Sequence, residues 1–286
     1  MVVKSHAQRN AQSLIEFAAI SLALYILLAA TIEMGRALFG AQVLQQAANV
    51  CGRELSKAPL PPTATFADAL NDPDVKKRIY DKRWLVIDLD ADVGAGQSLD
   101  DFFANKPLVN QQLRSLLIYE EVGGKRLLRY PGALLVDGNQ STGYTVAIPE
   151  VTSRGASGVE TISWVEVVEE VKAAAGDGPF SLTSAGTFKG MVAVRINYPF
   201  QAATTSAFQT PNGPFEPGPV IEADDTDVTD SSGPLSGSLR TADDGEVGTY
   251  AGPYGLGRQL AWGTTVRPFR RLLSAQSIGY RREITN

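Results

Sequence analysis

The chain of 286 residues holds a single histidine and a single cysteine. The histidine, His6, precedes the long apolar run near the start of the sequence, so histidine-based nucleophilic catalysis and histidine-rich metal sites are nearly excluded for the rest. Because Cys51 is alone, no intramolecular disulfide can form. The phosphate-binding pattern G-x-x-x-x-G-K-[ST] and the hydrolase pattern G-x-S-x-G are absent too. These absences argue against an enzyme, a cofactor or a metal centre.

A strong excess of one charge is also missing. The formal net charge is −5, and charged residues make up 20% of the chain. Because Lys and Arg do not outnumber Asp and Glu, nucleic acid is not expected as a partner. The hydrophobic fraction of 44% is ordinary for a folded protein.

One long apolar run is present near the start. It is uncharged from Phe17 to Ile32, and neither proline nor glycine interrupts it. A helix over residues 14–32 is roughly 28 Å long at about 1.5 Å per residue, which is enough for one transmembrane span. A cleaved secretory signal peptide is the alternative, although the run exceeds the usual signal core and no clear A-x-A site ends it.

The flanking charges predict the orientation of this span. Lys4 and Arg9 precede it, and Arg36 alone follows it closely. Positively charged flanks tend to stay in the cytoplasm. We therefore expect a single-pass protein of the cytoplasmic (inner) membrane, with its N-terminus inside and its C-terminal domain extracytoplasmic.

The helical pattern continues beyond the span. Small and apolar residues recur every three or four positions until Pro59, which ends the helix. They are Met34, Ala37, Leu38, Ala41, Leu44, Ala48, Cys51 and Leu55. The pattern predicts one continuous helix from about Ser13 to Ser56 with a packing stripe on its second half. Packing against the chain's own domain and packing against other subunits both remain open, as does an intermolecular disulfide at Cys51.

Glu16 is the unusual residue of the apolar run. A carboxylate at the bilayer centre costs about 2.5–3.5 kcal/mol on insertion scales, and Glu16 lies near one end of the run. In one interpretation its side chain reaches the polar interface and does nothing more. In the other it pairs with a cation on a neighbouring molecule and sets the register, because leaving either charge unpaired is costly.

The segment AQSLIEFAA…IEMGRALFGAQVLQQAANVCGREL resembles the N-terminal domain of TadE-like proteins, the minor pseudopilins of tight-adherence (Flp) pili. The matching elements are Glu16-Phe17-Ala18, then Glu33-x-Gly35-Arg36, then the alanine-rich stretch up to Arg53. The resemblance covers about residues 9–57. It implies a non-enzymatic role in the assembly or initiation of a type IVb-like pilus.

The resemblance also implies a processing site. Prepilin-like proteins are cut four residues ahead of a glutamate that becomes the fifth residue, which puts the cut between Ala11 and Gln12 and makes 1–11 a polar leader. Ala11 stands where the processed proteins usually have glycine. The new amine would then pair with Glu16 of a neighbouring subunit. The implied partners are the membrane, other pilin and pseudopilin subunits, a prepilin peptidase and the pilus assembly platform.

Residues 63–208 are predicted to form an extracytoplasmic α+β domain, a mainly antiparallel sheet with one or two covering helices. Segments rich in Gly, Asn, Asp, Ser and Pro separate the strand candidates. These candidates are WLVIDLD, RLLRYPGALLV, GYTVAIPEV, ETISWVEVVEEV and FKGMVAVRINYPF. Residues 209–247 are acidic and rich in Pro, Gly and Ser, which predicts a disordered loop. The Arg-rich segment 248–286 is expected to return to the domain.

Two groups of carboxylates are candidate sites. Asp88, Asp90 and Asp92 resemble a calcium loop but lack its glycine and its final glutamate, so solvated carboxylates at a strand end are expected. The glutamates at 166, 169 and 170 are expected on the wet face of a strand. The alternative to an assembly protein is a membrane-anchored binding or adhesion module that uses the pilin-like helix only as an anchor. A carboxylate-based hydrolase is the third and least favoured hypothesis.

Overall fold

The computed structural model describes the backbone of the chain in ten segments, and the side chains of part of these residues. They are residues 4–122, 125–130, 133–134, 145–154, 160–172, 178–184, 187–200, 221–222, 265–266 and 272–282. The expected acidic loop at 209–247 lies outside them, apart from Ile221–Glu222, and so does most of 248–271.

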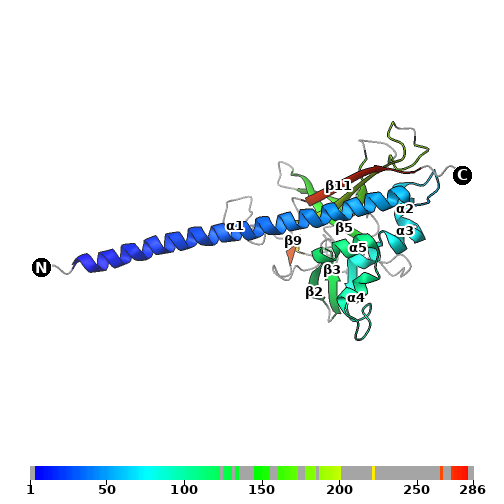
Figure 1. The fold of residues 1–286 in the computed structure, drawn as a ribbon. Helices are drawn as coiled ribbons and strands as arrows, with labels where there is room; N and C mark the ends of the chain where they lie inside the picture. The colour runs from blue at the N-terminus through cyan, green and yellow to red at the C-terminus, as the bar shows by residue number, and fades with distance from the viewer. Residues whose placement is uncertain are drawn as a thin grey trace. The chain divides into compact units, whose positions relative to one another are not determined.

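The chain divides into two units. The first unit holds α1 (Lys4–Lys57) up to Phe39, and the second begins at Gly40. Figure 1 shows α1 as the long blue helix. It begins at Lys4, inside the segment expected as a polar leader. Its end near Pro59 follows from the prolines, which cannot continue a helix.

Short helices follow α1 in the second unit. They are α2 (Phe66–Asn71), α3 (Pro73–Arg78), α4 (Leu99–Ala104) and α5 (Leu108–Leu113), with the 3₁₀ turns η1 (Lys82–Leu85) and η2 (Arg114–Leu116). Local chemistry explains the boundary between α2 and α3. Thr65 and Asp68 form a capping box at the start of α2. Asp72 then caps α3, with Pro73 in its first turn.

The strands form antiparallel sheets. They are β1 (Val86–Asp88), β2 (Ile118–Val122), β3 (Lys125–Arg129), β4 (Ala133–Leu134), β5 (Thr145–Arg154), β6 (Glu160–Glu166), β7 (Val168–Glu170), β8 (Met191–Pro199), β9 (Ile221–Glu222), β10 (Thr265–Val266) and β11 (Leu272–Tyr280). The strand orders are β1-β3-β2, β4-β5-β6, β11-β8-β7 and β10-β9, with every pair antiparallel. The expected α+β class, a long apolar helix followed by antiparallel sheets, is confirmed.

Two of the strand candidates are each divided between two sheets. The segment ETISWVEVVEEV supplies β6, which pairs with β5, and then β7, which pairs with β8. The change occurs at Val167, whose carbonyl accepts the backbone N–H of Asn197 (2.9 Å). In RLLRYPGALLV, β3 ends just before Tyr130-Pro131, and proline cannot donate to a strand ladder.

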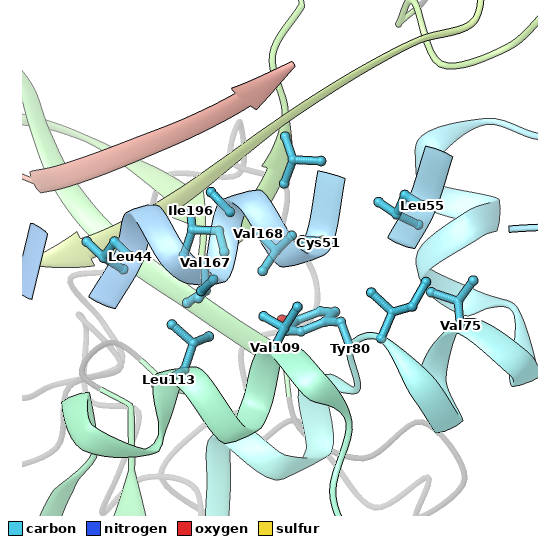
Figure 2. Close-up of a cluster of buried hydrophobic side chains, with 14 of the residues drawn as sticks. Leu44, Cys51, Leu55, Val75, Tyr80, Val109, Leu113, Val167, Val168 and Ile196 are labelled. Carbon is cyan, nitrogen blue, oxygen red and sulfur yellow. The ribbon is translucent and has the colours of Figure 1, made fainter. Parts of the chain in front are cut away.

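The main core of the second unit is built around the last part of α1. Figure 2 shows Leu44, Cys51 and Leu55 of α1 with strand residues on one side and the helices α3 and α5 on the other. Ile196 of β8 and Val109 of α5 are fully buried in this cluster. The last part of α1 is therefore a core element of this unit.

A second, smaller core lies around Ile87, Phe102 and Phe103. The rings of Trp84 and Phe102 meet edge to face at 5.6 Å. Lys106 places its Nζ 3.5 Å from the centre of the Trp84 ring, a cation–π contact. Burial lowers the pKa of Lys106 below its usual value.

Candidate functional site

In the first unit, α1 exposes its apolar side chains. Leu14, Phe17 and Tyr25 are 71%, 72% and 66% exposed, so no residue that the structure describes covers them. Within the described part of the chain, α1 is the one helix that is long and apolar enough to cross a membrane. Exposed apolar side chains along such a length are what a bilayer or a neighbouring apolar helix covers.

The residues assigned to processing and register all lie on this part of α1. Ala11 and Gln12 are in helical backbone, so the expected cut falls inside α1. Glu16 and Phe17 lie one helical turn further on, among the exposed side chains.

The Glu33-x-Gly35-Arg36 element forms a local ion pair. The Nη1 of Arg36 lies 3.3 Å from Oε1 of Glu33, an i,i+3 contact that contributes roughly 0.2–0.5 kcal/mol to a helix. A Cβ added at Gly35 would meet no atom within 4 Å. The fold of the monomer therefore gives no reason for glycine here, and a close approach by another molecule would supply one.

The packing stripe is divided. Leu44, Ala48, Cys51 and Leu55 are completely buried in the core of the second unit. Ahead of them Ala41 is exposed, and in the first unit Met34 is 66% exposed and Ala37 half-buried. The residues from Leu44 onward thus pack against the chain's own domain and present no surface to another subunit while the unit is folded.

Strand β11 approaches this part of α1 closely. A Cβ added at Gly52 would lie 2.7 Å from Oγ of Ser277, and one added at Gly279 would lie 2.8 Å from Oγ of Ser56. Polar contacts join the same two elements, since Nε2 of Gln45 donates to the carbonyl of Gln276 (3.0 Å). The two glycines permit the close approach because they carry no side chain.

Arg281 holds the chain just beyond β11. Its side chain is 8% exposed, and its Nη2 donates to the carbonyls of Leu60 (2.6 Å) and Pro61 (2.9 Å). Its Nη1 donates to the carbonyl of Phe180 (3.4 Å), and the guanidinium lies 4.8 Å from the centre of that ring. Sequence reasoning missed this contact because its partners are backbone atoms distant in the chain. The spacing Gly52-x-x-x-Ser56 was the one local signal of the close approach.

Cys51 is an inert core residue in the folded state. Its side chain is completely buried, and burial raises the pKa of its thiol to about 12. A buried, protonated thiol is a poor nucleophile. It is also out of reach of a second copy, which argues against an intermolecular disulfide between folded chains.

We expect Cys51 to resist maleimide labelling at neutral pH in the folded protein and to react fully once it is unfolded. In a Cys51→Ser background, Asn49→Cys places a thiol at an exposed position and should react rapidly in the folded state. Because the pKa is raised from 9.0, the unfolded state loses its proton first, so the free energy of unfolding falls as pH rises from 9.0 toward 12. Rapid labelling of folded Cys51 would contradict this burial.

The aspartates at and beyond the end of β1 form a turn. Oδ1 of Asp88 accepts hydrogen bonds from the backbone N–H groups of Asp90 (2.9 Å) and Ala91 (3.1 Å), and Oδ2 of Asp92 accepts one from the backbone N–H of Asp88 (2.9 Å). Asp90 also pairs with Arg126, whose hydrogen bond lowers the pKa of Asp90. Within the described segments no three His, Cys, Asp or Glu side chains are grouped to hold a metal ion.

Two of the glutamates around β7 form polar contacts within the fold. Glu169 forms an ion pair with Arg195 of β8 (3.2 Å) and accepts a hydrogen bond from Nδ2 of Asn197 (2.9 Å). Glu170 is half-buried and accepts the backbone N–H of Phe180 (2.8 Å). Burial raises the pKa of Glu170. These contacts position a turn and a strand.

The described residues define a class of protein: one apolar helix able to cross a membrane runs on into an α+β unit and supplies part of its core. The model of the family described as TadE-like protein matches residues 11–53, a segment that lies wholly within α1. This match confirms the resemblance drawn from the sequence and indicates involvement in the tight-adherence pilus system. Neither the curated proteins nor the solved structures contain a match to the chain.

Proposed function

We propose that the chain is a minor pseudopilin-like protein, non-enzymatic, that takes part in the assembly or initiation of a tight-adherence pilus. The observation that carries this proposal is the TadE-like match on a helix whose apolar side chains are exposed up to Phe39. The helix is anchored in the cytoplasmic (inner) membrane, with the N-terminus in the cytoplasm and the second unit outside. Its partners are other pilin and pseudopilin subunits, a prepilin peptidase and the pilus assembly platform.

The first part of α1 is exposed and the apolar stripe of its last part is buried, which supports this role and restricts the surface open to other subunits. Residues 14–39 are available to neighbouring helices, whereas Leu44 to Leu55 are used by the chain's own core. Contacts between subunits therefore involve the first part of α1, including the open position at Gly35. Glu16 near the start of this surface sets the register by pairing with the amine that processing after Ala11 exposes at Gln12.

Replacing Glu16 with glutamine is expected to reduce co-purification of the chain with other pilin subunits by about tenfold or more, since an uncompensated charge of the pair remains. Asp74→Asn on α3 is the matched control, because it also removes one exposed carboxylate. Mass spectrometry of the same preparation should find a mature N-terminus at Gln12. Unchanged co-purification of the Glu16 variant, or a start beyond Ile32, would contradict the proposal.

A further inference from the structure

Five side chains of the second unit form an exposed patch of apolar and cationic residues, called here the Phe188–Arg282 patch. Its three large apolar members are Phe188, Ile278 and Tyr280, which are 56%, 67% and 61% exposed. Its cations are Lys189 and Arg282, also exposed. Single exposed apolar residues are ordinary on protein surfaces, but a contiguous group of them usually marks an interaction site.

Backbone contacts bring the two parts of the patch together. Tyr280 pairs with Met191 at the start of β8, and the N–H of Met191 donates to the carbonyl of Phe188 (3.1 Å). The N–H of Arg281 donates to the carbonyl of Gly190 (2.8 Å). The turn at 187–190 therefore lies directly against the end of β11.

The register of β11 points Ile278 and Tyr280, the two members of the patch on this strand, away from α1. Ser277 and Gly279 face α1, where they approach Gly52 and Ser56. Because side chains alternate along a strand, Ile278 and Tyr280 lie on the opposite face.

The charge of the patch is opposite to that of the chain. The formal net charge of the chain is −5, whereas the described residues of the patch carry two cations and no acid. Glu283 follows Arg282 in the sequence, beyond the described residues. The repulsion between the acidic chain and an anionic surface is screened beyond about 8 Å at physiological salt. At contact, the cations of the patch therefore determine the sign of its electrostatic interaction with the surface.

We propose that the Phe188–Arg282 patch binds the surface of an anionic phospholipid bilayer. Lys and Arg meet lipid phosphates, while aromatic and aliphatic side chains enter the boundary between headgroups and acyl chains. A free phosphate would use the two cations and leave the apolar side chains in water. A purely polar acidic protein segment would likewise leave the three large apolar side chains uncovered. This inference is independent of the proposed pilus function.

The test uses the full chain held in nanodiscs of phosphatidylcholine alone. Its binding to separate vesicles is measured by flotation, with vesicles of phosphatidylcholine or of phosphatidylcholine mixed with phosphatidylglycerol. We expect binding only to the mixed vesicles, weaker at higher salt, and unaffected by inorganic phosphate at matched ionic strength.

The variant Lys189→Gln/Arg282→Gln should bind the mixed vesicles roughly 30-fold less, because each cation near an anionic surface contributes about a fivefold gain. Phe188→Ser/Tyr280→Ser should also lose binding. These two changes remove no charge, so the loss would show that the apolar side chains contribute to binding. The matched control for each class of change lies outside the patch. These controls are Lys77→Gln on α3 and Tyr119→Ser on β2, both at exposed positions, and they should bind as the unchanged chain does.

Several results would overturn the proposal. Equal loss in the control and patch variants would mean a non-specific effect. Competition by inorganic phosphate would assign the patch to a free anion. Absence of vesicle binding, with an acidic protein bound instead through Lys189 and Arg282, would assign it to a protein partner. None of these results bears on Glu16, so the pilus function is tested separately.

Discussion

Gly52→Leu is expected to detach β11 from α1 and to lower the free energy of unfolding of the second unit by about 1–3 kcal/mol. A Cβ at this position would lie 2.7 Å from Oγ of Ser277 and 3.1 Å from its Cβ. The hydroxyl can rotate away, but the Cβ is fixed to the backbone of β11. A leucine side chain adds three further carbons beyond that Cβ, so helix and strand must separate.

The measurement is denaturant unfolding of the full chain in detergent, followed by the fluorescence of its tryptophans. Gly35→Leu is the matched control, since a Cβ there meets nothing within 4 Å. It makes the same chemical change in the same helix and should leave the second unit as stable as before. Equal stability of the two variants would mean that α1 and β11 are not in close contact.

Arg281→Met is expected to lower the free energy of unfolding by about 2–3 kcal/mol. Hydrogen bonds from a charged donor contribute roughly 1.5–3 kcal/mol each. The cost of burying the cation offsets part of their sum. Three carbonyls, those of Leu60, Pro61 and Phe180, lose their guanidinium donor. Methionine is long and apolar, so it keeps much of the packing and isolates the polar loss.

The neighbouring Arg282 supplies the control for this prediction. It is exposed, so Arg282→Met should change stability by less than about 0.5 kcal/mol. Arg281→Lys should lower the free energy of unfolding by an amount between those of Arg281→Met and Arg282→Met. An ammonium keeps the charge but lacks the planar guanidinium that reaches several carbonyls. If the methionine variants at 281 and 282 unfold at the same denaturant concentration, Arg281 does not hold the chain beyond β11.

Local signals explain why much of the fold was predicted correctly. The periodic residues from Met34 to Leu55 and the prolines after Pro59 specify a helix and its end through interactions within a few residues. The break between α2 and α3 likewise follows from Asp72-Pro73. The apolar residues of the candidate FKGMVAVRINYPF alternate, and β8 (Met191–Pro199) lies within that candidate.

Long-range contacts explain where the structure differs from what the sequence predicts. The segment ETISWVEVVEEV has one strand-like pattern, yet the bond from Asn197 to Val167 divides it between two sheets. The role of Arg281 depends on carbonyls more than 200 positions earlier in the chain, at Leu60 and Pro61. Carbonyls are present at every residue, so no sequence pattern identifies which of them an arginine will meet.

The sequence by itself determined the apolar helix, the place of Glu16 on it and the TadE-like resemblance, because these depend on side-chain order along one helix. Only the tertiary structure decided how the packing stripe is used. Leu44, Ala48, Cys51 and Leu55 continue the same periodicity as Met34 and Ala41. The first four are buried in a core with residues of β8, β11 and α5, whereas Met34 and Ala41 are exposed. Periodicity specifies which face of a helix is apolar, whereas burial depends on which distant elements reach that face.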